Sequence, residues 1–167
     1  IRKGATNEAI ADTTKIVIEF VQMLREVVEY EAVLAANVKD VEVLKKAKDM
    51  GFSDSYIAKV WGMNKLDLYR FRKENGVMPI YRIVDNVEHQ QDYVPYFYSC
   101  YHGENESVIT DKKKILVLGS GPIRIGQGVE FDYSTVHAVM TIKNAGYEAI
   151  IINNNPETVS TDFDTAD

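Results

Sequence analysis

Hydrophobic positions in the first half of the chain recur at steps of three and four residues. The longest series predicts one amphipathic helix over about residues 15–36, with apolar members Ile16, Phe20, Met23, Leu24, Val27, Tyr30 and Leu34. A second helix is expected after an N-cap at Asp40 and should end at Gly51. Ser53 and Asn64 can each cap a further short helix, and Asn75-Gly76 ends the last one. The first half is therefore predicted to be helical.

A turn, a cap and a short helix occur twice within this half. Residues 4–11, Gly-Ala-Thr-Asn-Glu-Ala-Ile-Ala, align with residues 51–58, Gly-Phe-Ser-Asp-Ser-Tyr-Ile-Ala. The second copy is similar to a DNA-reading helix-turn-helix, because Gly62 provides a turn and the last helix is basic. Its basic residues are Arg70, Arg72 and Lys73. The first copy lacks them, which favours a packing role and leaves DNA binding as the alternative.

The second half predicts a different architecture. An apolar run over residues 115–118 is followed by a glycine-rich loop and then by a helical stretch that Gly146 ends. A second apolar run follows at residues 149–152. Strand, loop, helix and strand within about forty residues predict a βαβ unit with two parallel strands and a right-handed crossover.

Between the two halves, residues 79–112 predict a connector. Tyr81, Ile83 and Val84 favour a short strand, and crowded aromatic residues follow without helical spacing. Base stacking on these rings is disfavoured, because no lysine or arginine occurs between Arg82 and Lys112. The histidines and the single cysteine of this segment do not suggest a metal site.

Composition and charge restrict the class of protein. Hydrophobic residues make up 46% of the 167-residue chain and charged residues 26%, as in folded domains. Uncharged apolar stretches run only a few residues, whereas a bilayer span needs about 20. Residues 1–76 carry 13 Lys+Arg against 12 Asp+Glu, and residues 77–167 carry 6 against 13. Neither half is basic enough to hold nucleic acid by phosphate neutralisation, so we expect neither membrane nor nucleic-acid partners.

Two further features concern the setting of the chain. Cys100 is the single cysteine, so no internal disulfide can form, which favours a reducing, cytoplasmic location. The chain begins with Ile1 and ends among polar residues, and we expect it to be a piece of a longer protein.

The glycine loop is the main candidate site. It contains Gly119, Gly121, Arg124, Gly126, Gln127 and Gly128. A dinucleotide fingerprint would need Gly or Ala at position 124 and an acid at position 153, where Asn153 stands. A Walker loop would need Lys at position 127. What remains is a backbone that can approach a ligand closely, beside a helix N-terminus.

The loop and its surroundings resemble a known family. The run Gly-Ser-Gly-Pro-Ile-Arg-Ile-Gly-Gln-Gly-Val-Glu-Phe-Asp-Tyr at 119–133, with Asn-Asn-Asn-Pro-Glu-Thr-Val-Ser-Thr-Asp at 153–162, resembles the start of the second synthetase half of the carbamoyl-phosphate synthase large subunit. The first half resembles the oligomerisation domain of that family, including Pro-Ile-Tyr-Arg-Ile-Val-Asp at 79–85. Val17 stands where the family more often has an Asp helix cap.

The resemblance implies a mixed fold class. We expect an all-α helical oligomerisation domain at residues 1–78 and an aromatic-rich connector at 79–112. Residues 113–167 are expected to be a truncated α/β Rossmann-like βαβ unit, the first part of a pre-ATP-grasp domain.

The resemblance also implies a function. The parent would be an ATP-dependent ligase that makes carbamoyl phosphate from bicarbonate, ammonia (from glutamine) and two ATP, for pyrimidine and arginine biosynthesis. ATP and Mg (or Mn) would be bound mainly by an ATP-grasp domain outside this chain, so the chain alone is expected to be inactive and to contain no catalytic residue and no metal ligand. Its partners would be further copies, through the helical domain, and a small glutaminase subunit.

By the same resemblance, Gly128, Glu130 and Glu157 would line a carbamate tunnel. A glycine leaves room for a small ligand, and carboxylates can accept carbamate N–H bonds.

Two alternatives to the ligase remain: a DNA-binding helical module, and a purely structural assembly domain.

Overall fold

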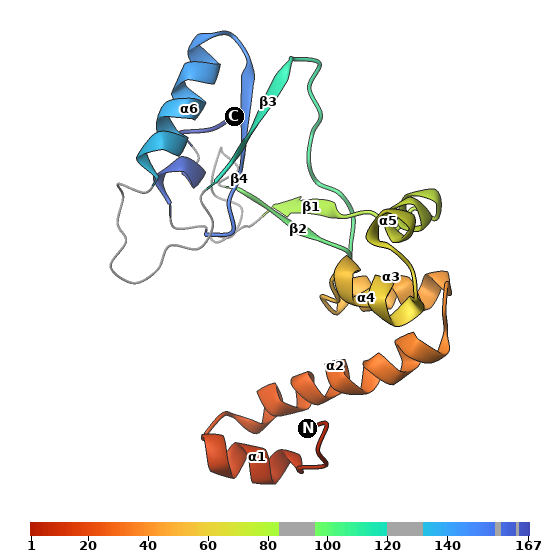
Figure 1. Cartoon of the computed structure of the whole chain (residues 1–167). Coiled ribbons are helices and arrows are strands. Elements are labelled where there is room, and N and C mark those ends of the chain that lie inside the picture. Colours follow the sequence, from red (N-terminus) through yellow and green to blue (C-terminus); the bar gives the residue numbers. More distant parts are fainter. Residues whose placement is uncertain (84–95, 120–131, 156–157, 163) are drawn as a thin grey trace. The chain divides into compact units, whose positions relative to one another are not determined.

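A computed structural model describes residues 1–83, 96–119, 132–155, 158–162 and 164–167 (Figure 1). The chain forms two compact units. The helical unit contains Ile1–Pro79 and Cys100–Gly103, and the second unit contains Ile80–Ser99 and Glu104–Asp167. The predicted fold class is confirmed, because five helices precede a mixed region with parallel strands.

The amino-terminal helix α1 (Asn7–Thr14) is the first of the two turn–cap–helix copies. Thr6 Oγ1 accepts the N–H of Ala9 at 3.2 Å, as expected of an N-cap. Lys15 ends α1 in the left-handed conformation, with φ 61°, and its N–H donates to Ala11 O. This reversal separates α1 from the long helix that follows.

The long helix α2 spans Ile18–Ala36, so the prediction was correct in its end and three residues early in its start. Val17 occupies its N-cap position and makes no side-chain hydrogen bond, because valine offers no acceptor. Because valine stands where the family more often has Asp, the first N–H groups of α2 have no side-chain cap.

Three short helices complete the helical unit. They are α3 (Val41–Asp49), α4 (Asp54–Trp61) and α5 (Lys65–Glu74). Their predicted caps are all confirmed: the side chains of Asp40, Ser53 and Asn64 each accept a backbone N–H in the first turn. Gly62 ends α4 with φ 65°, a conformation that favours glycine.

The core of the helical unit lies between the carboxyl half of α2 and helices α3 to α5. Its buried members are Leu34, Leu44, Ala47, Phe52, Ile57, Ala58, Trp61, Leu68 and Val77. Trp61 Nε1 donates to Leu34 O at 2.8 Å, so the polar edge of the one tryptophan is satisfied inside the core. The helices are joined by one continuous apolar cluster.

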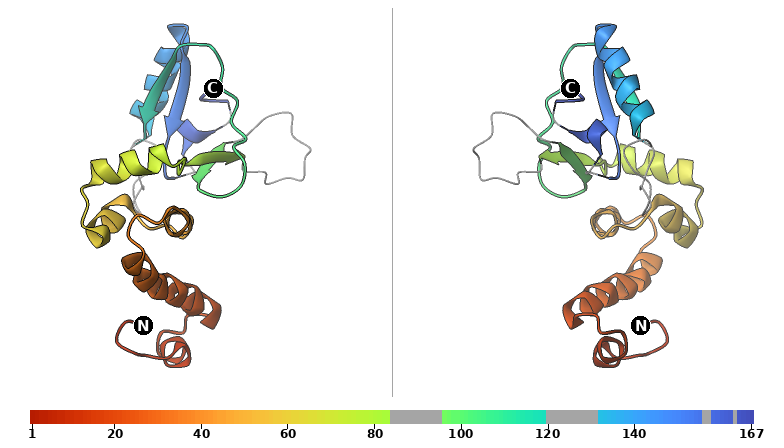
Figure 2. Two further views of the ribbon diagram at one scale, coloured as in Figure 1. Left: turned by 90° about the vertical axis from the view of Figure 1, so that its right-hand side faces the viewer. Right: turned by 90° about the vertical axis from the view of Figure 1, so that its left-hand side faces the viewer.

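The second unit contains two small sheets. Strands β1 (Ile80–Ile83) and β2 (Phe97–Cys100) pair with one another. Strands β3 (Lys114–Leu118) and β4 (Glu148–Ile152) are parallel, in register from Lys114↔Glu148 to Leu118↔Ile152. Helix α6 (Tyr133–Asn144) connects them and packs on both, as the two side views in Figure 2 show. The predicted βαβ unit is present.

The described aromatic residues of the predicted connector lie partly in a strand. Phe97 and Tyr98 belong to β2 and are each 41% exposed. Tyr101 alone among the described rings of the segment packs against the helical core.

Candidate functional site

The candidate site starts at the carboxyl ends of β3 and β4, which lie side by side because the strands are parallel. Gly119 N–H donates to Ile152 O at 2.7 Å and extends the ladder by one residue beyond β3. A Cβ at Gly119 would lie 2.7 Å from Cγ of Asn153, closer than packing allows. Position 119 therefore requires glycine because the Asn153 side chain lies against it.

Asn153 organises the segment after β4. Its Oδ1 accepts the N–H of Asn155 at 3.0 Å, and its Nδ2 donates to Thr158 Oγ1 at 3.1 Å. Thr158 is 4% exposed, and its hydroxyl is also within 3.3 Å of Ser160 Oγ. The Asn153 side chain uses both its oxygen and its nitrogen in these contacts. This explains why an amide stands at the position where a dinucleotide-binding fold has an acid.

Asp132 forms the second attachment of this region. Its carboxylate, 1% exposed, accepts the Ser160 N–H at 2.6 Å and the Ser160 hydroxyl at 2.7 Å. Asp132 directly precedes α6, and Ser160 lies in the short helix η2 (Val159–Thr161). The start of α6 is thereby bonded to the segment that follows β4.

These contacts tie together two loop segments at both of their ends. Residues 119–132 connect β3 to α6, and residues 153–160 follow β4. Both begin at the strand edge, where Gly119 meets Asn153, and both end at the Asp132–Ser160 pair. Parallel α/β sheets bind ligands at this carboxyl edge.

Most predicted site residues lie on these two segments, outside the described residues. They are Gly121, Arg124, Gly126, Gln127, Gly128, Glu130 and Glu157. Their assignments stay predictions, and Gly119 is the one loop glycine whose surroundings are described.

Asp132 is the residue that sequence reasoning left unassigned. An Asp immediately before a helix is normally an N-cap. Here Asp132 has φ −97° and ψ −10° and makes no cap hydrogen bond. Its partner Ser160 is 28 residues away, a separation that no local pattern reveals.

Comparison with known families covers both parts of the chain. Residues 1–76 match the model of the carbamoyl-phosphate synthetase large chain, oligomerisation domain, and residues 111–167 match that of the carbamoyl phosphate synthase preATP-grasp domain. The chain belongs to the carbamoyl-phosphate synthetase large chain family. This confirms the resemblance and places the Gly119 edge in the pre-ATP-grasp domain of an ATP-dependent ligase.

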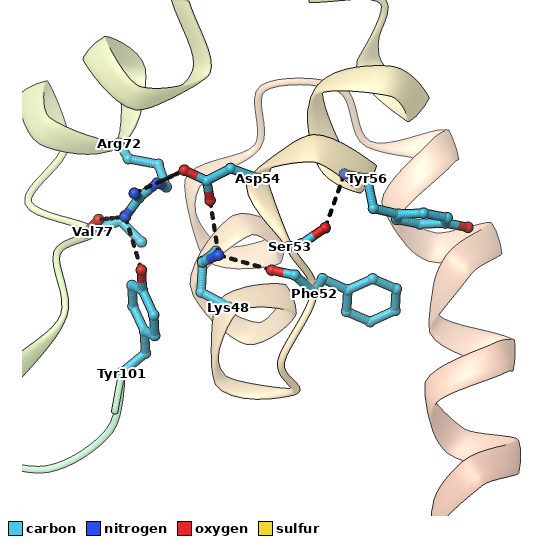
Figure 3. Close-up of polar contacts among 8 residues, drawn as sticks. All are labelled: Lys48, Phe52, Ser53, Asp54, Tyr56, Arg72, Val77 and Tyr101. Atoms are coloured by element: carbon cyan, nitrogen blue, oxygen red, sulfur yellow. Dashed lines mark hydrogen bonds and ion pairs between the residues drawn. The ribbon is translucent and has the colours of Figure 1, made fainter. Parts of the chain in front are cut away.

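The structure of the oligomerisation domain also shows the role of one basic residue, Arg72. Arg72 is 6% exposed; its Nη2 lies 2.9 Å from Asp54 Oδ2, and its Nη1 donates to Val77 O at 2.8 Å (Figure 3). Lys48 bonds to the other oxygen of Asp54 at 2.8 Å and to Phe52 O. Arg72, which the helix-turn-helix interpretation needed on the surface, is a buried structural cation instead.

Tyr101 closes this cluster from a segment far along the chain. Its hydroxyl lies 3.2 Å from Arg72 Nη1, and the Lys48 ammonium lies 5.0 Å from its ring centroid (Figure 3). Burial acts to raise the pKa of Asp54, but hydrogen bonds and charge from Lys48 and Arg72 outweigh it and lower that pKa below its usual value. The carboxylate therefore stays ionised between its two cations.

The two histidines among the described residues each contact a neighbouring side chain. His102 Nδ1 lies 2.8 Å from Asp49 Oδ1, and the ring of His137 lies against that of Tyr133, with centroids 4.1 Å apart and planes inclined by 47°. Within the described ranges, no group of three or more His, Cys, Asp or Glu side chains could hold a metal ion. No helix in the described part of the chain is long and apolar enough to cross a membrane.

Proposed function

We propose that this chain serves a carbamoyl-phosphate synthase large chain by joining its assembly region to the entrance of its second synthetase half. The observation that carries the proposal is the order of the two matched domains, oligomerisation at 1–76 and pre-ATP-grasp at 111–167, in one polypeptide. The parent activity is ATP-dependent synthesis of carbamoyl phosphate from bicarbonate and ammonia, which feeds pyrimidine and arginine biosynthesis.

Within that activity we assign Gly128, Glu130 and Glu157 to the carbamate tunnel. The assignment is supported by the described contacts at the ends of both segments that carry these residues, at Gly119–Asn153 and Asp132–Ser160. Anchored segments can keep a narrow passage open for a small anion, which a freely moving loop cannot do.

The remaining chemistry belongs to other parts of the enzyme. ATP with Mg or Mn would be bound mainly by the ATP-grasp domain. The isolated chain is expected to be inactive, to self-associate through its helical unit, and, within the cytoplasmic parent, to work beside a small glutaminase subunit.

The test is Gly128→Phe in the full-length enzyme. A bulky ring should block passage of carbamate while leaving each synthetase half competent. Bicarbonate-dependent ATP hydrolysis by the first half and ATP formation from carbamoyl phosphate by the second should persist near the unmodified rates. Overall carbamoyl-phosphate synthesis should fall at least about tenfold.

Gly128→Ala is the matched control, because it adds a Cβ to the backbone but fills little space. It should retain overall synthesis. If Gly128→Ala and Gly128→Phe both lower the two partial reactions together with the melting temperature, the position is a strained turn and the tunnel assignment is wrong.

A further inference from the structure

The apolar stripe of α2, which begins at Ile16 just before the helix, extends beyond the part that the domain itself buries. Its members follow one another at steps of four, three, four, three and four residues: Ile16, Phe20, Met23, Val27, Tyr30 and Leu34. At the carboxyl end, Leu34 is fully buried, and Val27 and Tyr30 pack against the core. At the amino end, Phe20 and Met23 are each 60% exposed. One half of a continuous stripe is therefore covered and the other half is not.

Helix α1 does not cover the free half. It packs beside α2, where Val21 is 1% exposed and Arg25 donates to Ala5 O at 2.6 Å. The free half comprises Phe20, Met23 and Leu24 on α2, together with Ile16 and Val17 directly before its first turn. All five are between 45% and 60% exposed, and we call this surface the α2 apolar face. Charged side chains flank it, so five adjacent apolar residues stand out against a polar surface.

We propose that the α2 apolar face is the surface through which two copies of this chain pair, α2 against α2. The proposal rests on the self-association stated under the proposed function and names its surface. The occupant follows from the match of this region to an oligomerisation domain and from the spacing, because steps of three and four residues let two like helices interlock. Pairing of one face with itself gives a closed dimer.

The size of the face is sufficient for such a pair. Five side chains that are about half exposed offer on the order of 100 Å² each, so two copies bring together about 1,000 Å², the lower limit for a specific interface. Antiparallel crossing avoids collision, because α3 to α5 lie at the carboxyl end of α2 and would then extend from opposite ends of the pair (Figure 1).

The experiment is sedimentation analysis of the 167-residue chain at about 1 to 100 μM. The unmodified chain should be dimeric at the upper concentration. The double variant Phe20→Glu/Met23→Glu should be monomeric, with a dissociation constant raised at least about 100-fold, because it would bury four unpaired charges per dimer. Trp61 fluorescence should remain native, since both replaced side chains are exposed.

Leu66→Glu is the matched control, because Leu66 is 56% exposed and lies on α5, outside the face. It should leave the dimer intact. A second measurement uses Met23→Cys in a Cys100→Ser background, which should form a disulfide-linked dimer under mild oxidation, whereas Leu66→Cys should not.

The outcomes separate the surface from the proposed function. If the unmodified chain and the double glutamate variant are both dimeric, self-association stands and the α2 apolar face is the wrong surface. If the unmodified chain is monomeric at every concentration, the proposed self-association is wrong, and so is the proposed surface. The α2 apolar face would then contact another part of the parent protein.

Discussion

The helical unit joins nine buried hydrophobic residues in one cluster, whereas the described residues of the βαβ unit bury two hydrophobic side chains, Val139 and Ala149, and four polar ones. Those four are Asp132, Thr135, Thr158 and Ser160. The difference shows two ways of ordering a chain. Apolar contacts are non-directional and stabilise the packed helices as a group. Hydrogen bonds are directional and fix the positions of particular atoms in the βαβ segments.

This contrast agrees with the two roles proposed for the chain. A surface for assembly needs a rigid body behind it, which an apolar core provides. A passage for a small intermediate needs specific segments in specific places, which directed polar contacts provide. The helical unit contains one polar exception, the Lys48–Asp54–Arg72 cluster, and it ties helices together rather than positioning loops.

The largest expected effect is that of Leu68→Ala, which should cost about 3 to 4 kcal/mol of unfolding free energy by removing a fully buried side chain. Urea unfolding followed by Trp61 fluorescence measures it, because the one tryptophan lies in the same core. Leu118→Ala, at 73% exposure, should change the same transition by less than about 0.5 kcal/mol. Equal costs would contradict the apolar description of the helical unit.

The next largest effect should be that of Asp54→Asn, which should lower the free energy of unfolding by about 2 to 3 kcal/mol. The substitution leaves two buried cations without a counter-charge, and the figure is at the low end because Asp54 is 27% exposed. The matched control is Glu42→Gln, which removes an ion pair to Lys45 that is fully on the surface and should cost less than about 0.5 kcal/mol. A cost below that of the control would show that the cluster does not stabilise the unit.

The same carboxylate predicts an acid dependence. Because the pKa of Asp54 is lower in the folded state than in the unfolded chain, its contribution is present above the unfolded value, about 3.9, and is lost as the pH falls through the folded value. The stability difference between the unmodified chain and Asp54→Asn should therefore be full above about pH 5 and shrink below about pH 4. Unfolding titrations at several pH values measure it, and a difference that is constant down to about pH 2 would contradict the assignment.

In the βαβ unit, Asp132→Ala should cost about 2 kcal/mol by leaving the Ser160 N–H and hydroxyl buried without their acceptor. Hydrogen exchange should speed up at the amide of Ser160. Asp132→Asn should restore part of the protection, because an amide oxygen can accept the N–H while the hydroxyl turns to accept from the amide. Unchanged exchange in Asp132→Ala would mean that the polar tie does not order these segments.

The smallest effect concerns helix starts, where the two units differ at equivalent positions. Ser53 caps α4 locally, whereas Asp132 before α6 makes a distant contact. Ser53→Ala should cost about 1 kcal/mol in the Trp61 transition, and Ser53→Asp, an equally good cap, should cost almost nothing. If both variants cost the same, the hydroxyl of Ser53 does not act as a cap.

The sequence by itself determined the elements with local causes. Thr6, Asp40, Ser53 and Asn64 were recognisable as caps, because a cap bonds to N–H groups within three residues of itself. The βαβ order and its parallel strands followed from the spacing of apolar runs, and the glycine loop with its flanking segments carried enough of the family pattern to be recognised.

Only the tertiary structure decided the contacts between residues that are distant in sequence. Arg72 was a DNA-reading residue only in the alternative interpretation, and its pairing with Asp54, 18 positions earlier, showed it to be buried. The role of Asp132 became clear only from its distant partner Ser160. The need for glycine at position 119 became clear only from the side chain of Asn153, directly after the neighbouring strand β4. Local pattern specifies backbone hydrogen bonding, but the partner of a buried polar group depends on which segments packing brings together.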